Sequence, residues 1–143
     1  MTNYKVARVS APSQCEMTTR ATEDVVQVIV PHGAIPSPNP LSAGVAVGRL
    51  LFVSGQTAAD KSGVEAQTRE VLEKLGAVLR AAGSDFAHVA RCGVYLKDAG
   101  SFGEMNAVYR EYFPRDSPAR STIICTLANA DVLIEIDCVA EIP

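Results

Sequence analysis

The sequence has few of the residues that build metal sites. It contains two histidines and four cysteines among 143 residues, and no two cysteines stand in a C-x-x-C spacing. Zinc sites need clustered cysteine and histidine ligands, so we expect no metal site. Cysteine-based nucleophilic catalysis is also disfavoured, because His32 and His88 have no motif-linked cysteine partner.

Positive charge is also scarce. The chain has 13 lysines and arginines against 16 aspartates and glutamates, which gives a formal net charge of -3. This balance disfavours nonspecific binding to nucleic-acid phosphates and to anionic lipid. We therefore expect neither a nucleic acid nor a membrane as a partner. A local basic pocket is still compatible with this composition.

Long apolar runs are absent. No stretch approaches the ~20 apolar residues that a membrane-spanning helix needs. The first residues do not show a basic segment followed by an apolar stretch, which would mark a signal peptide. Cys92, Cys125 and Cys138 lie inside apolar segments, where a buried, reduced thiol is ordinary. These features favour a cytoplasmic protein.

The composition that remains is typical of one compact domain. Hydrophobic residues make up 48% of the chain and charged residues 20%, so disorder is not expected. A chain of this length buries roughly two-thirds of its unfolded surface, which is enough for one core. Residues 1–24 show no periodicity. We therefore expect an N-terminal extension at 1–24 and a single domain at 25–143.

Hydrophobic periodicity predicts an α+β domain. A β-rich run at 25–30 leads into a proline-rich loop that ends near residue 40. Strands are predicted at 42–47, 50–54, 89–96, 122–127 and 132–140, and helices at 65–82 and 101–113. Gly83 is the expected C-terminal cap of the first helix, and Ser101 with Glu104 forms a capping box for the second. The order β-β-α-β-α-β-β indicates two helices on one face of a sheet.

The last predicted strand carries two acidic residues in its middle. Alternation places five apolar residues on one face: Val132, Ile134, Ile136, Cys138 and Ala140. The other face carries Leu133, Glu135, Asp137 and Val139. The two carboxylates therefore belong to the face that the helices are expected to leave uncovered.

The expected pairing brings an arginine near these carboxylates. If residues 128–131 form a hairpin turn, then Arg120, Thr122 and Ile124 lie opposite Val139, Asp137 and Glu135 on the same side of the sheet. Arg120 and Glu135 are then ~13 Å apart along the strands, which leaves room for a small polar molecule.

That face has two interpretations. A half-exposed sheet with charged outer residues is ordinary. However, Ile124, Leu133 and Val139 share the face and form an apolar patch, which favours cover by another copy of the chain.

Several of these segments together resemble the Rid (YjgF-type) family. The segments are residues 118–123 (PARSTI), 134–136 (IEI), 51–56 (LFVSGQ), 96–98 (LKD) and the Phe102, Met105, Asn106, Tyr109, Tyr112 and Phe113 pattern of the second helix. They are collinear with the family over residues 32–143. The resemblance implies a chorismate-mutase-like α+β fold that assembles as a homotrimer with clefts between subunits. It also implies hydrolytic deamination of 2-imino or 2-enamino acids, such as 2-aminoacrylate, to 2-keto acids and ammonia without a cofactor.

The resemblance also implies roles for individual residues. Arg120 would hold the substrate carboxylate in a bidentate pair, and Glu135 would position or activate water as general base. Ser54 and the Gly55 backbone N–H would meet the substrate, with Asn106 near the cleft. Simpler roles stay open for each side chain: a surface ion pair for the arginine or the glutamate, a strand cap for Ser54, and a helix-surface position for Asn106.

The chain departs from the family pattern at two positions. Leu41 stands where many imine-deaminating members have a tyrosine that lines the pocket, and Thr122 stands where a cysteine is frequent. Both affect the expected substrate range and leave the arginine in place.

Three functions are therefore compared. The first is the imine or enamine deaminase, and the second is a non-catalytic trimer that binds a small carboxylate. A binder tolerates Glu135→Gln, whereas a hydrolase loses turnover. The third, an endoribonuclease, is disfavoured by the acidic composition and by the lack of a basic stripe with interleaved aromatic residues.

Overall fold

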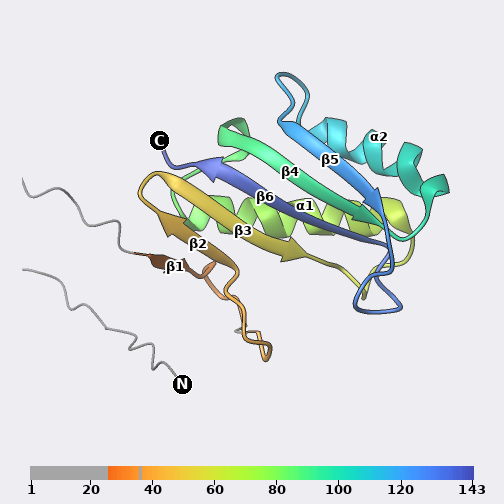
Figure 1. Ribbon diagram of the computed structural model, residues 1–143, viewed down its shortest axis with the longest axis horizontal. Coiled ribbons are helices and arrows are strands. Elements are labelled where there is room, and N and C mark those ends of the chain that lie inside the picture. The colour runs from red at the N-terminus through yellow and green to blue at the C-terminus, as the bar shows by residue number, and fades with distance from the viewer. Residues whose placement is uncertain (1–25, 36) are drawn as a thin grey trace, which may run out of the picture.

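The computed structural model describes residues 26–35 and 37–143, which form one six-stranded mixed sheet with two helices on one face (Figure 1). The elements are β1 (Gln27–Ile29), β2 (Gly44–Val47), β3 (Leu50–Gln56), α1 (Val64–Ala81), η1 (Phe86–His88), β4 (Val89–Leu96), η2 (Ala99–Ser101), α2 (Phe102–Tyr112), β5 (Ala119–Ile124) and β6 (Ile134–Glu141). The predicted α+β class, with both helices on one face, is confirmed. The predicted N-terminal extension at 1–24 lies outside the described residues.

The first strands of the sheet form consecutive antiparallel pairs. β1 pairs with β2, and β2 pairs with β3 through the predicted two-residue turn at Gly48 and Arg49. The β-rich run before the proline-rich loop therefore becomes an edge strand. Val47 and Leu50 face each other across the turn, as the hairpin pattern predicts.

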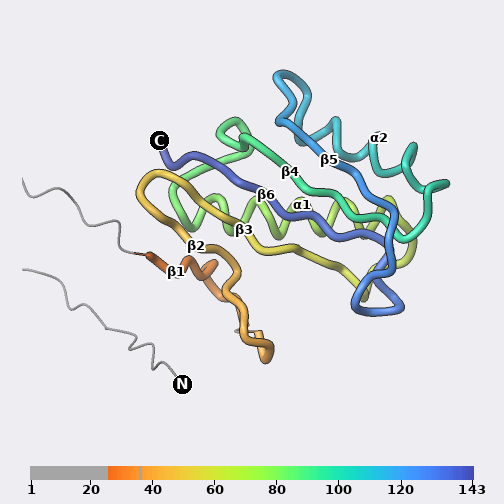
Figure 2. The backbone as a smooth tube through the Cα atoms, in the orientation of Figure 1, coloured from red at the N-terminus to blue at the C-terminus, as the bar shows by residue number. Residues whose placement is uncertain are grey.

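The other side of the sheet contradicts the predicted hairpin between the last two strands. β5 pairs in parallel with β4, and β6 inserts antiparallel between β3 and β4, so the strand order is β1-β2-β3-β6-β4-β5. Figure 2 shows this path, with β4 and β5 side by side and β6 running between β3 and β4. The predicted pairing of Arg120, Thr122 and Ile124 with Val139, Asp137 and Glu135 is therefore wrong.

The physical reason lies in the composition of the two strands. Ile134, Ile136, Cys138 and Ala140 of β6 are buried, whereas the residues of β5 are all exposed or only partly buried. The strand with the continuous apolar face occupies the centre, where both of its edges make hydrogen bonds. β5 becomes the edge strand. It returns alongside β4 through the crossover helix α2, as parallel neighbours require.

The core lies between the sheet and the two helices. α1 buries its apolar stripe, which includes Val71, Leu72, Leu75, Val78 and Leu79, and α2 buries Met105, Val108 and Tyr109. Two polar contacts join the outer sides of the helices. Arg69 makes a bidentate pair with Glu111 at 2.5 and 2.9 Å, and the Tyr112 hydroxyl donates to Glu73 at 2.7 Å.

The start of α2 differs from the predicted capping box. Ser101 has helical backbone angles and makes no capping hydrogen bond with its side chain. Asp98 acts one turn earlier, where its carboxylate accepts from the Gly100 N–H at 2.6 Å and caps η2. The short 3-10 turn supplies the first turn in place of the Ser101 cap.

None of the helices in residues 26–35 and 37–143 combines the length and the apolar character needed to cross a bilayer.

Gly83 ends α1 as predicted. It has a φ of +77°, its N–H donates to the Arg80 carbonyl at 3.0 Å, and the Ser84 N–H donates to the Leu79 carbonyl at 2.9 Å. These bonds satisfy carbonyls that the last helical turn would otherwise leave unpaired.

The cap predicts opposite effects for the same substitution at two glycines. Gly83→Ala forces a side chain into the left-handed region and should lower the free energy of unfolding by about 1 kcal/mol. Gly103→Ala, inside α2 with open space around the position, should raise it by up to about 1 kcal/mol. Urea unfolding at one protein concentration measures both. Equal effects of the two substitutions would contradict this account of the cap.

Candidate functional site

The sheet face opposite the helices, here called the open face, carries the two acidic residues of β6. Glu135 and Asp137 are both partly buried there, while their neighbours Ile134, Ile136 and Cys138 point into the core. The predicted alternation of this strand is confirmed. The open face also carries exposed apolar side chains, namely Leu50, Phe52 and Ile123.

Glu135 lies directly over Gly55 of β3. A methyl group at Gly55 would overlap the Glu135 carboxylate, so the glycine provides the space in which that carboxylate sits. β3 and β6 change register between Val53 and Gln56, which marks a bulge at this point. Burial and the neighbouring charge of Asp137 raise the pKa of Glu135. The residue has the environment of a general base or acid.

Asp137 is held by two residues that sequence reasoning missed. The Tyr95 hydroxyl donates to Asp137 at 3.0 Å, and a terminal nitrogen of Arg91 lies 3.7 Å from its other oxygen. Asp137 pairs with Gly93 across the β4–β6 ladder, where a methyl group would come within 2.8 Å of the carboxylate. The alternation of β4 places Arg91 and Tyr95 on one face, but only the β4–β6 register reveals that they meet Asp137.

Arg120 lies on the other face of the sheet. β5 aligns Arg120 with Cys92 of β4, and the Cys92 side chain is in the core. The Arg120 guanidinium lies over two aromatic rings of α2. The guanidinium carbon is 4.7 Å from the centre of the Tyr109 ring and 5.8 Å from that of Phe102. The prediction that Arg120 and Glu135 share a face of one chain is therefore wrong, because that prediction depended on the hairpin.

Two further predicted site residues lie on the side of Arg120. Thr122 follows two residues later on β5, aligned with Val94, and is partly buried. Asn106 is partly buried on α2, next to Met105. Both belong to the helix-covered side, so within one chain neither shares the open face with Glu135.

Ser54 lies in β3, next to the end of the loop that precedes β2. Its hydroxyl donates to the Ser42 carbonyl at 2.6 Å, and its N–H donates to the Ala43 carbonyl at 3.0 Å. The hydroxyl therefore ties the start of β2 to β3, and its oxygen keeps acceptor capacity for a ligand.

A cleft of about 790 Å³ adjoins this point. It lies between the loop after β1, the end of β3 and α1, and Leu41 and Gly55 both line it. Lys74 also lines the cleft, with its ammonium bound to the Thr57 carbonyl at 2.8 Å. Leu41 is 56% exposed, so its side chain is available at the cleft wall.

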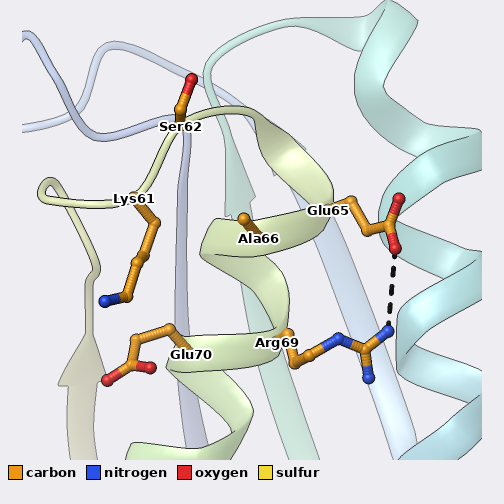
Figure 3. Close-up of a pocket in the computed structure, with 6 residues that line it drawn as sticks. All are labelled: Lys61, Ser62, Glu65, Ala66, Arg69 and Glu70. Carbon is orange, nitrogen blue, oxygen red and sulfur yellow. Dashed lines mark ion pairs between the residues drawn. The ribbon is translucent and has the colours of Figure 1, made fainter.

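A second hollow, of about 420 Å³, lies at the start of α1 (Figure 3). Its lining residues are Lys61, Ser62, Glu65, Ala66, Arg69 and Glu70. The charges there compensate one another: Arg69 pairs with Glu65 at 3.8 Å and with Glu111, and Lys61 with Asp60 at 3.0 Å. It contains none of the predicted site residues.

The described part of the chain holds no cluster of three or more His, Cys, Asp or Glu side chains that would bind a metal ion. Cys92 and Cys138 are buried, and burial raises the pKa of both thiols, that of Cys138 to about 12. Thiols in this environment stay protonated and are poor nucleophiles.

Comparisons with known proteins agree with this architecture. A family sequence model described as endoribonuclease L-PSP matches residues 32–142. A RutC family protein of Synechocystis is 38% identical over 125 residues, 80% of this chain and 96% of the relative. Two solved structures also superpose: a YjgF family member from Neisseria meningitidis (TM-score 0.74, 29% identity, 82% and 95% coverage) and RidA from an Antarctic Psychrobacter (TM-score 0.75, 26% identity, 80% and 98% coverage). The chain belongs to the Rid (YjgF-type) family and has its chorismate-mutase-like fold.

Proposed function

We propose that this protein hydrolyses reactive 2-imino and 2-enamino acids, such as 2-aminoacrylate in its imine form, to 2-keto acids and ammonia. The observation that carries the proposal is the Glu135 carboxylate, which is partly buried over Gly55 with a raised pKa on a face that its own helices leave open. Family membership adds the reaction class. No cofactor is required, because water is the only co-substrate.

The proposed site is completed by a second copy of the chain. Arg120 and Glu135 lie on opposite faces of one sheet, so a small substrate cannot contact both within one chain. β5, which carries Arg120, is an edge strand. The exposed Leu50, Phe52 and Ile123 on the open face favour cover by a neighbour. We therefore propose a homotrimer in which Arg120 of one subunit reaches the Glu135 side of the next.

The proposed chemistry is a hydrolysis with one proton relay. Arg120 binds the substrate carboxylate through two charge-assisted hydrogen bonds and sets the distance to the imine carbon. Glu135 accepts a proton from water as the oxygen adds to that carbon and returns this proton to the nitrogen, which gives a carbinolamine. Glu135 then takes the proton of the carbinolamine hydroxyl and passes it to the nitrogen. The C–N bond breaks as the keto group forms, and ammonia leaves. Gly55, Ser54 and Leu41 line the approach, with Asn106 and Thr122 on the side of Arg120.

Two other functions are weighed against the hydrolase. A trimer that only binds a small carboxylate would use Arg120 in the same way and would not depend on Glu135 as a base. An endoribonuclease, the description of the matching family model, is opposed by charge. The net charge is -3, and Glu135 and Asp137 would face the phosphodiester.

We also propose a cytoplasmic location. The cysteines of the described residues, Cys92, Cys125 and Cys138, are free. Free thiols are typical of a reducing compartment, and the proposed substrates arise there when dehydratases act on hydroxyamino acids.

The first prediction from the proposed function concerns turnover. With 2-aminoacrylate generated in situ by a serine dehydratase and trapped by semicarbazide, wild-type protein should suppress the semicarbazone. Arg120→Ala should abolish suppression because the carboxylate loses its anchor. Glu135→Gln should lower kcat by at least about 10²-fold because the base is lost.

The control separates the competing functions. Glu135→Gln should still bind pyruvate, the keto acid product, with wild-type affinity. Pyruvate binding by wild-type protein without suppression of the semicarbazone would favour the binder, and cleavage of RNA by wild-type protein but not by Arg120→Ala would favour the ribonuclease. Lys61→Ala, in the hollow at the start of α1, should leave activity unchanged.

The second prediction tests the shared site by complementation. Arg120→Ala and Glu135→Gln should each have little activity alone. Unfolding and refolding them together at equal amounts should restore about a quarter of wild-type activity, because random assembly pairs intact Arg120 and Glu135 at that fraction of interfaces. Refolding either variant alone is the control. A mixture with no recovered activity, despite proven subunit exchange, would contradict a site shared between two subunits.

The third prediction concerns pH. Glu135 must be ionised to act as the base, so kcat/KM rises with pH through its pKa. Burial is the larger cause of the raised pKa of Glu135, and the charge of Asp137 is the second. Asp137→Asn keeps an oxygen for Tyr95 and should move the acidic limb of the pH profile to lower pH. Asp60→Asn, a carboxylate outside the site, serves as the charge control. An acidic limb that stays in place in Asp137→Asn would remove this role.

A further inference from the structure

We propose that Phe102 and Tyr109 of α2 form an aromatic cradle that positions Arg120 for carboxylate binding. This inference rests on the proposed function only in taking Arg120 as the carboxylate anchor. It assigns a task to two residues that do not touch the substrate, and so they are positioning residues rather than catalytic ones.

The cradle leaves the hydrogen-bond donors of Arg120 without a strong acceptor among the described residues. The guanidinium carbon is 4.7 Å from the centre of one ring and 5.8 Å from that of the other, both within the ~6 Å range of cation–π attraction. A guanidinium that stacks on aromatic rings keeps its N–H groups in its own plane, in the fork that a carboxylate matches.

No strong acceptor competes for these donors. The hydrogen bond found for the Arg120 side chain reaches the Met105 sulfur at 3.9 Å, and a thioether is a weak acceptor. Within residues 26–35 and 37–143, no carboxylate lies within ion-pair distance of Arg120. A partly buried arginine without an anion is costly unless an anion arrives from outside the chain.

The cradle is rigid on one side and open on the other. Tyr109 is 4% exposed, and its ring packs against Phe113 at 4.6 Å between centres. Phe102, seven residues earlier on the same helix face, is 44% exposed. Both rings lie against the guanidinium itself, the buried Tyr109 ring nearer and the exposed Phe102 ring farther, so together they limit where it can lie.

The Tyr109 hydroxyl has no part in this arrangement. It is buried and makes no hydrogen bond within the described residues, and burial raises its pKa. The ring face is therefore the functional portion of Tyr109. This division supplies a matched control, because phenylalanine keeps the face and removes the hydroxyl.

The experiment measures pyruvate binding by calorimetry and the Arg120 side-chain N–H signal by NMR in full-length variants. Phe102→Leu and Tyr109→Leu should each weaken pyruvate binding by about 3- to 10-fold. Each should also move the Arg120 Nε–H resonance downfield, because a ring current is lost. Tyr109→Phe and Phe102→Tyr keep both rings and should match wild type in both measurements.

The outcomes separate this inference from the proposed hydrolysis. Binding that follows the ring faces supports the cradle whether or not the protein turns over imines. Wild-type affinity in Phe102→Leu, or no pyruvate binding by the wild-type protein, overturns it even if deamination is observed. Phe102 is half-exposed, so its leucine variant tests the cradle even where Tyr109→Leu fails to fold.

Discussion

The insertion of β6 between β3 and β4 is the constraint on which the rest of the structure depends. β6 is hydrogen-bonded along both edges, and its alternate residues close the core under α1. Because side chains alternate along a strand, the same register that buries Ile134, Ile136 and Cys138 sends Glu135 and Asp137 to the opposite face. A slip by one residue would place both carboxylates in the core.

The neighbours of β6 make this placement tolerable. Two carboxylates in the middle of a central strand need space and hydrogen-bond donors, since burying a charge is costly. β3 offers Gly55 beneath Glu135, and β4 offers Gly93 and the Tyr95 hydroxyl to Asp137. The two carboxylates of β6 thus differ in their surroundings. Asp137 is held by its donors, whereas Glu135 keeps a raised pKa and remains free to exchange a proton.

The central place of β6 also separates the two charges of the proposed reaction. With β6 inside, β5 becomes the edge strand beside β4 and turns Arg120 toward α2. One chain therefore presents a carboxylate of raised pKa on its open face and an arginine beside two aromatic rings at its edge. Under the proposed assembly, these two incomplete halves meet at each interface, so hydrolysis would depend on association of the subunits.

Local patterns in the sequence determined much of this protein. Helical periodicity predicted α1 and its Gly83 cap, alternation predicted β4 and the two faces of β6, and the motifs around Arg120 and Glu135 identified the family. These features depend on neighbours a few residues apart, so they are readable along the chain. The predicted bounds of β5 were displaced, from 122–127 to Ala119–Ile124.

Only the tertiary structure decided which strands lie side by side. A short link between β5 and β6 suggested a hairpin. In the structure, β6 instead pairs with β3 and β4 along its two edges and buries its apolar face, and this outweighs the closeness of β5 and β6 in sequence. That choice placed Arg120 with Phe102 and Tyr109, and Asp137 with Tyr95 and Arg91. Strand pairing joins segments far apart in the chain, and its free energy depends on the whole core rather than on any local pattern.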